Sequence, residues 1–285
     1  MAQYGFITVF AGLTKEQVEQ RVDHMINTLN IRDFQFYDAF YKYSQPMVPG
    51  AATFVTKAST LLNTNRAVNP AIVQAYVDHI RKRGGRSWLY VQSVGADEPN
   101  LPGYTKANYD HYVSGVATPL LYCYVPDEKW AQRMCDIWAP FALYMKFDGI
   151  HWDSLGYCNN AFGNGAVFTG FLGATRNLLE RHGLLQTFNF VDGFGWNPQL
   201  VHDNVIEFPY WEVWTLPVCE DQFFKEMEAF SGGQKGVFAC YTYGDRELAK
   251  NRYNKCVHSG CRYLVFGDGN RMLYSEYFPN NVEMV

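Results

Sequence analysis

Short apolar or aromatic runs alternate along the chain with longer segments in which apolar residues recur every three or four positions. The short runs are typical of buried strands, and the longer segments are typical of amphipathic helices. Eight strands are predicted in this way, at residues 34–40, 88–92, 119–125, 149–153, 184–190, 205–214, 236–242 and 262–266. Helices are predicted between most of them, at residues 69–83, 127–145, 167–182, 220–230 and 246–258.

Repeated strand–helix units predict a parallel sheet, and eight of them in roughly 250 residues match the size of a (β/α)8 TIM barrel. A doubly wound open sheet is the alternative, but no predicted strand leads into a GxGxxG turn that would cradle a phosphate. The chain contains no low-complexity stretch, long linker or block of like charges. We therefore expect residues 1–285 to form one α/β domain.

Composition excludes several classes of protein. With 48% hydrophobic residues in 285, the chain is too apolar to be disordered. Its 24 Lys and Arg against 28 Asp and Glu give a net charge of −4, which predicts no affinity for nucleic acid or anionic membranes. No run approaches the roughly 18 apolar residues of a membrane helix. The aromatic fraction of 17% fits either an aromatic-rich barrel core or rings that bind sugars, partner proteins or further copies of the chain.

The seven cysteines are an odd number and include no CxxC pair. Cys123 and Cys240 lie inside apolar runs, where a reduced buried thiol is usual. The apolar run from Gly5 to Leu13 has no Lys or Arg before it, unlike a signal peptide. These features predict a cytoplasmic protein, with secretion as the alternative.

Acidic residues gather where the predicted strands end, which is the catalytic end of such a barrel. They are Asp38, Asp153, Asp192, Glu212 and Asp268, and Gln92 ends another strand. Asp192 is interpreted as a helix cap, and Asp268 as either a turn or a functional residue. An isolated carboxylate costs several kcal/mol to desolvate, so carboxylates beside large aromatic residues indicate use. Asp153 follows Trp152, and Glu212 lies between Trp211 and Trp214.

Other chemistries find less support. The chain has no GxSxG nucleophile elbow. His151 and Asp153 share one side of a strand, so a metal site with Glu212 is an alternative, although such a histidine is more often a hydrogen-bonded core or rim residue. We therefore predict no metal and no cofactor.

At these positions the chain resembles the catalytic barrel of glycoside hydrolase family 66, the family of bacterial dextranases and cycloisomaltooligosaccharide glucanotransferases. Four segments in the family's order carry the resemblance. They are NIRDFQFYD at residues 30–38, FDGIHWDSLG at 147–156, YWEVW at 210–214 and FGDGNRMLYSEYFPN at 266–280. The likeness extends from about residue 28 to the C-terminus.

The resemblance implies an endo-acting, retaining cut of an α-1,6-linked glucan, with transglycosylation as a second outcome. It places the nucleophile on Asp153, the acid/base on Glu212, and a hydroxyl-binding carboxylate on Asp38. Tyr37 and Asp268 would help to line the −1 subsite. Trp211, Trp214 and the charge of Asp153 would raise the pKa of Glu212, which must carry a proton.

The chain departs from the family pattern around the predicted site. Ala39 replaces the tryptophan after the first-strand aspartate, Trp152 replaces a small residue, and Gln92 replaces an expected asparagine. We predict that Gln92, Trp152 and Trp214 contact an oligo- or polysaccharide, in a domain without the family's flanking β-sandwich modules. The alternative is a catalytically silent barrel with a structural, self-assembling or glycan-binding role, in which Trp152 would fill the cleft.

Overall fold

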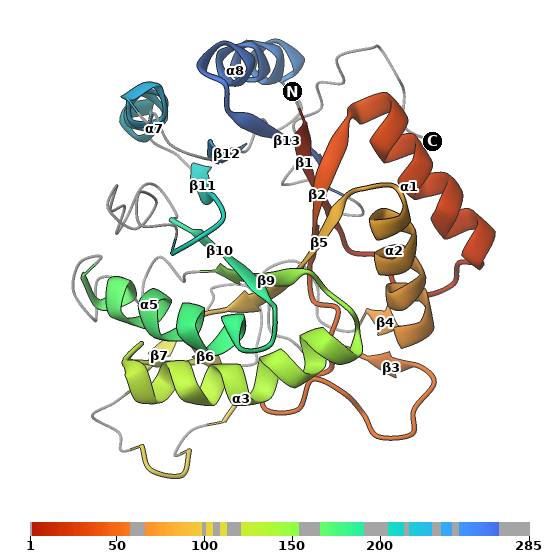
Figure 1. Cartoon of the computed structure of the whole chain (residues 1–285), viewed down its shortest axis with the longest axis vertical. Coiled ribbons are helices and arrows are strands. Elements are labelled where there is room, and N and C mark those ends of the chain that lie inside the picture. Colours follow the sequence, from red (N-terminus) through yellow and green to blue (C-terminus); the bar gives the residue numbers. More distant parts are fainter. Residues whose placement is uncertain are drawn as a thin grey trace.

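Eight parallel strands close into a barrel in the computed structural model, in the order β1-β13-β12-β11-β10-β9-β5-β2 (Figure 1). The structure describes residues 2–57, 66–98, 101–104, 109–112, 121–153, 166–190, 205–213, 217–229, 235–240 and 245–267. The barrel strands are β1 (Gln3–Ile7), β2 (Ile31–Phe36), β5 (Arg86–Gln92), β9 (Gly149–Asp153), β10 (Leu185–Asn189), β11 (Pro209–Val213), β12 (Val237–Cys240) and β13 (Arg262–Gly267). The predicted (β/α)8 barrel is confirmed.

Helices surround the strands on the outside (Figure 1). They are α1 (Lys15–Leu29), α2 (Pro70–Lys82), α3 (Glu128–Tyr144), α5 (Ala166–Glu180), α7 (Pro217–Ala229) and α8 (Arg246–Ser259). Side chains that accept from exposed backbone N–H groups begin four of them: Thr14, Asn69, Asp127 and Asp245. Such caps satisfy donors that have no partner inside the helix.

The sequence predicts the number of barrel strands but not all of their identities. Residues 119–125 were assigned to the barrel, whereas β8 (Leu121–Tyr124) lies in a separate antiparallel sheet with β6 (Gly95–Ala96) and β7 (Tyr109–Tyr112). The eighth barrel strand is β1, which pairs with both β2 and β13. A further small sheet joins β3 (Phe54–Val55) to β4 (Ala67–Val68).

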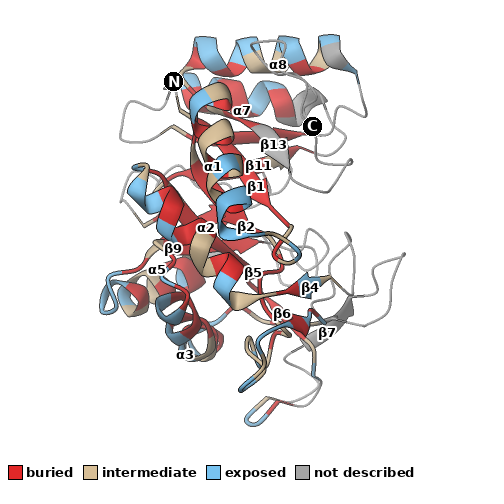
Figure 2. Ribbon diagram, turned by 90° about the vertical axis from the view of Figure 1, so that its right-hand side faces the viewer, coloured by how far each residue is buried: buried red, intermediate tan, exposed pale blue. Residues whose placement is uncertain are grey.

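Strand alternation divides the apolar residues into two cores. One lies between the strands and the helices, and the other fills the barrel itself. The interior core comprises Phe208, just before β11, and residues on the inward face of their strands: Tyr4, Phe6, Trp88, Tyr210, Val237, Ala239 and Leu264. Figure 2 shows the described parts of the barrel strands almost wholly buried, with exposed residues on the outward faces of the helices. The barrel is therefore a packed core whose chemistry lies at its ends.

Gly149 makes room for one of these interior rings. A Cβ at this position would lie 2.6 Å from Cζ3 of Trp88 and 2.5 Å from the main-chain oxygen of Leu185. Only glycine lets β9 and β10 approach each other beside the indole without a clash.

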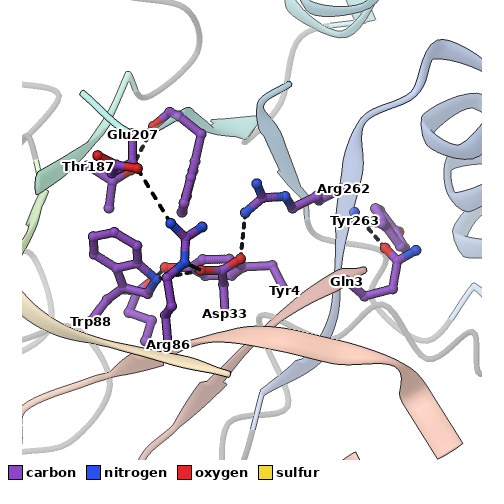
Figure 3. A network of polar contacts seen from close by, with 11 residues as sticks. Gln3, Tyr4, Asp33, Arg86, Trp88, Thr187, Glu207, Arg262 and Tyr263 are labelled. Carbon is purple, nitrogen blue, oxygen red and sulfur yellow. Dashed lines mark hydrogen bonds and ion pairs between the residues drawn. The ribbon is translucent and has the colours of Figure 1, made fainter. Parts of the chain in front are cut away.

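Ion pairs fill the barrel where the strands begin (Figure 3). Asp33 is 3% exposed and accepts hydrogen bonds from Nε of Arg86 at 2.8 Å, Nη1 of Arg262 at 2.6 Å and Nε1 of Trp88 at 2.9 Å. Burial lowers the pKa of Arg262, and the charge of Asp33 acts in the opposite direction. This network fixes the end of the barrel that lies opposite the predicted site.

Four cysteines of the described residues are buried and free: Cys135, Cys240, Cys256 and Cys261. Burial raises the pKa of the Cys135 thiol to about 12 and that of Cys240 to about 11. These thiols are therefore inert at neutral pH. Within the same described ranges, no helix combines the length and apolar character that a membrane crossing requires.

Candidate active site

The two predicted catalytic carboxylates lie at the carboxyl ends of strands that are separated by one strand. Asp153 is the last residue of β9, and Glu212 is the fourth residue of β11. Between them runs β10, which pairs with both neighbours and ends at Asn189. Asp153 is 8% exposed. The barrel therefore brings both acidic side chains to one part of its rim.

Asn189 joins the two carboxylates through a single amide. Its Nδ2 donates to Oδ1 of Asp153 at 2.6 Å and to Oε2 of Glu212 at 3.0 Å. Its Oδ1 accepts from the main-chain N–H of Glu212 at 3.3 Å. Because one nitrogen contacts both groups, these two carboxylate oxygens can lie no further apart than about 5.6 Å, the sum of the two distances.

A second neutral donor reaches Asp153 from β5. The phenol of Tyr90 donates to Oδ2 of Asp153 at 2.6 Å. Burial and then the charge of Asp153 hold the pKa of Tyr90 well above its usual value. The phenol therefore stays protonated. Hydrogen bonds of this kind to a carboxylate favour its charged form.

Two predicted substrate-binding residues adjoin Tyr90. The ring of Tyr37 lies against that of Tyr90, with 4.0 Å between centroids. Nε2 of Gln92 donates to the phenol oxygen of Tyr90 at 3.3 Å. Burial, followed by the charges of Asp38 and Asp153, raises the pKa of Tyr37 well above its ordinary value. The structure thus places both residues beside the carboxylate pair.

Asp38 lies just beyond the end of β2. It is 1% exposed and adopts a left-handed backbone conformation, with φ of 58°. Nη2 of Arg66 lies 3.7 Å from its Oδ2, and Nη1 of the same guanidinium donates to the carbonyl of Thr8 at 3.2 Å. Arg66 precedes β4, outside the barrel strands. A search of strand ends alone therefore could not find this cation.

His151 lies two residues before Asp153 on the same face of β9. Its ring is stacked on Tyr90 at 6.1 Å and meets the edge of Tyr210 at 4.9 Å. It is fully buried, and burial lowers its pKa to about 3, so the imidazole is neutral. No hydrogen-bond partner reaches either ring nitrogen among the described residues. Within the same ranges, no three His, Cys, Asp or Glu side chains are grouped as metal ligands.

Trp152 is not part of this group. Its indole is buried against Phe171 of α5 and donates to Oε1 of Gln186 at 3.1 Å. Adjacent residues of a strand point to opposite sides, so Trp152 faces the helices while Asp153 faces the barrel. Trp211 likewise packs on Phe223 of α7, away from Glu212. This is a correction to the expectation that these rings border the carboxylates.

Three other residues singled out in the sequence, Trp214, Asp268 and Asp192, lie outside the described residues. Tyr90 and Asn189 were missed. Both lie within correctly predicted strands, and Asn189 lies at the end of its strand. A search for neutral polar residues at strand ends, in addition to acidic ones, would have found Asn189.

A surface hollow of about 470 Å³ lies at the other end of the barrel. Arg81, Lys146, Asp148 and Leu185 are among the residues that line it, near the starts of β9 and β10. It is remote from the strand ends that carry Asp153 and Glu212, so it is not part of the candidate site.

A closed eight-stranded barrel with two adjacent carboxylates at the carboxyl ends of its strands defines a class, the barrel proteins of the glycosidase type. Within that class, the chain belongs to glycosyl hydrolase family 66, whose family model matches residues 2–285. The resemblance inferred from the four sequence segments is thereby confirmed.

Two relatives align with most of this chain, but the alignment covers only part of each relative. Two cycloisomaltooligosaccharide glucanotransferases of Niallia circulans are 25% and 26% identical to it, over 88% and 85% of the chain. The match covers 28% of each relative. The chain therefore spans less than a third of these proteins.

Solved structures show the same fold at lower identity. A Paenibacillus sp. cycloisomaltooligosaccharide glucanotransferase, in complex with cycloisomaltoheptaose, matches 84% of this chain and 38% of its own with a TM-score of 0.69 and 20% identity. The glycoside hydrolase domain of PelA from Pseudomonas aeruginosa matches 94% of each chain, with a TM-score of 0.55 and 12% identity. The barrel fold is thus shared with both of these proteins.

Proposed function

We propose that this chain is a retaining glycosidase or transglycosylase acting on an α-1,6-linked glucan, with Asp153 as nucleophile and Glu212 as acid/base. The observation that carries the proposal is the amide nitrogen of Asn189, which holds one oxygen of each carboxylate within about 5.6 Å of the other. Retaining glycosidases need carboxyl groups about 5–5.5 Å apart, whereas inverting enzymes need about 6.5–9.5 Å. The spacing supports the retaining mechanism.

The reaction then has two steps. Asp153 attacks the anomeric carbon while Glu212 gives its proton to the leaving oxygen, so that a glycosyl–Asp153 ester forms as the glycosidic bond breaks. Glu212 next takes a proton from water or from a sugar hydroxyl, whose oxygen displaces Asp153. Water gives hydrolysis, and a hydroxyl gives transfer. Both steps use groups that the barrel rim supplies.

The substrate class is inferred from family membership and from the name of the relatives, cycloisomaltooligosaccharide glucanotransferase. Tyr37, Asp38 and Gln92 are proposed to bind the sugar in the −1 subsite, because the first and last adjoin Tyr90 and the second lies at the neighbouring strand end. Trp214 and Asp268 remain predictions. The alternative of a silent barrel expects Trp152 to fill the cleft. Its indole is instead buried against Phe171 of α5.

The test is incubation of the 285-residue chain with isomaltooligosaccharides, dextran and α-glucans of other linkages, followed by assay of reducing ends and cyclic products. We expect products from α-1,6-linked substrates, with the first product retaining the α-configuration by proton NMR. Asp153→Asn should abolish turnover and leave the circular dichroism spectrum unchanged. Full activity in Asp153→Asn, or inversion at the anomeric carbon, would overturn the assignment. Silence on every glucan would favour the silent barrel.

A further inference from the structure

The side-chain amide of Asn189 contacts both carboxylate-bearing residues. It has two N–H donors and a carbonyl oxygen that accepts. The nitrogen contacts Asp153 and Glu212, and the oxygen accepts from the main chain of Glu212. Asn189 is only 2% exposed, so water does not compete freely for these bonds.

The orientation of this amide is fixed by its surroundings. A flipped amide would turn its NH2 group toward the main-chain N–H of Glu212, and two donors would then face each other. It would also turn its carbonyl oxygen toward two carboxylates. Of the two orientations, only the observed one satisfies these three contacts, so the donors of Asn189 point at the carboxylates.

We propose that Asn189 is a positioning residue that orients both carboxylates and keeps Asp153 ionised. The inference rests on the proposed function and deepens it. The amide is neutral, so it stabilises the charge of Asp153 by hydrogen bonding without forming an ion pair. Its bond to Asp153, at 2.6 Å, is shorter than its bond to Glu212, at 3.0 Å. The stronger contact therefore falls on the group that must be charged, and the weaker one on the group that must carry a proton.

Two substitutions separate this role from simple filling of space. Asn189→Asp preserves the shape and the acceptor for the main-chain N–H, but it replaces the donor by an oxygen and adds a negative charge. Asn189→Ala removes the donor with a loss of volume and adds no charge. The proposal predicts that Asn189→Asp loses more kcat than Asn189→Ala, with both falling by about 100-fold or more. A space-filling role predicts the reverse order, because Asp fits the site better.

The pH profile gives a second readout in the same variants. Loss of a donor to the charged form of Asp153 should move the acidic limb of kcat/KM to higher pH by about one unit in Asn189→Ala. Thr187→Val is the matched control. Thr187 lies two residues earlier on β10, and its hydroxyl donates to the carbonyl of Phe208 at 2.8 Å. This control should keep the wild-type limb. Wild-type kinetics and an unmoved limb in Asn189→Ala would overturn the proposal.

A titration tests the inference without turnover. In NMR spectra of the wild-type chain, the side-chain amide protons of Asn189 should shift with the same midpoint as the carboxyl carbon of Asp153. The Asp153 midpoint should rise by about one pH unit in Asn189→Ala. Amide protons that do not respond to the ionisation of Asp153 would refute the proposal. Failure of the proposed function is recognised separately, by an Asp153→Asn variant that remains active or by a wild-type chain that is silent on every glucan.

Discussion

Asp33 offers the sharpest test of how the end of the barrel away from the site is held together. Asp33→Asn would keep the shape of this side chain but remove its charge and turn one acceptor into a donor. The guanidinium groups of Arg86 and Arg262 now donate to its two oxygens at 2.8 and 2.6 Å (Figure 3). The substitution would set at least one of them against an N–H group inside the barrel.

The expected cost follows from the burial of the group. Removing one partner of a buried ion pair costs about 3–5 kcal/mol. Arg86 is 27% exposed, and asparagine keeps one acceptor, so we expect Asp33→Asn to lower the free energy of unfolding by about 2–4 kcal/mol. For a chain of this size, 1 kcal/mol corresponds to about 2–4 °C in Tm, which gives a decrease of about 5–15 °C.

The assay is thermal and urea unfolding followed by circular dichroism, with Asp78→Asn as the control. Asp78 pairs with Lys146 at 3.1 Å, and both side chains are about half exposed, so its loss should cost less than about 1 kcal/mol. Asp33→Asn should retain the wild-type kcat well below its Tm, because Asp33 lies away from the catalytic rim. A decrease in Tm no larger than that of the control would refute the reasoning.

Three further predictions concern the barrel interior. Tyr90→Phe removes the donor to Asp153, so we expect the acidic limb of kcat/KM to move to higher pH by about one unit, and an unmoved limb would contradict the role of this phenol. The pKa of His151 is about 3 when folded and near 6.5 when unfolded, so the unfolded chain binds more protons between these values. Stability should therefore fall as pH decreases below about 6.5, and His151→Phe should flatten this dependence in urea titrations at pH 4–7, whereas an equal slope in both proteins would count against a neutral buried imidazole. Gly149→Ala would place a Cβ 2.5 Å from the carbonyl oxygen of Leu185, so we expect a loss of about 1–3 kcal/mol in urea unfolding, and wild-type stability would show that the two strands can separate freely.

The fold could be predicted because strands and helices leave different periodicities in the sequence, and the observed barrel strands β5 and β9 match predicted ones closely. Periodicity does not say which sheet a strand joins. Residues 119–125 are apolar enough for the barrel, yet β8 pairs in an antiparallel sheet with β6 and β7. Conversely, β1 overlaps the apolar run of residues 5–13, for which the sequence predicts no strand.

The carboxylates could be found because burying charge is costly, and an acidic residue at a strand end therefore demands an explanation. Asn189 and Tyr90 are neutral, so the cost of burying charge does not single them out in the sequence. The position of Trp152 was available from strand alternation, since it must face away from Asp153. Arg66 could not be found in this way, because the backbone that brings it to Asp38 belongs to a small sheet outside the barrel.

The two ends of the barrel treat buried carboxylates in opposite ways, and this difference explains where chemistry can occur. Asp33 forms ion pairs with two guanidinium groups, which neutralise its charge and hold β2 to β5 and β13. Asp153 instead receives hydrogen bonds from a phenol and an amide, which favour its charged form and carry no positive charge themselves. A glycosyl transition state develops positive charge at the sugar, and an anion held by neutral donors can stabilise that charge. We therefore expect a cation introduced beside Asp153, such as Gln92→Lys, to reduce kcat even if the fold is unchanged.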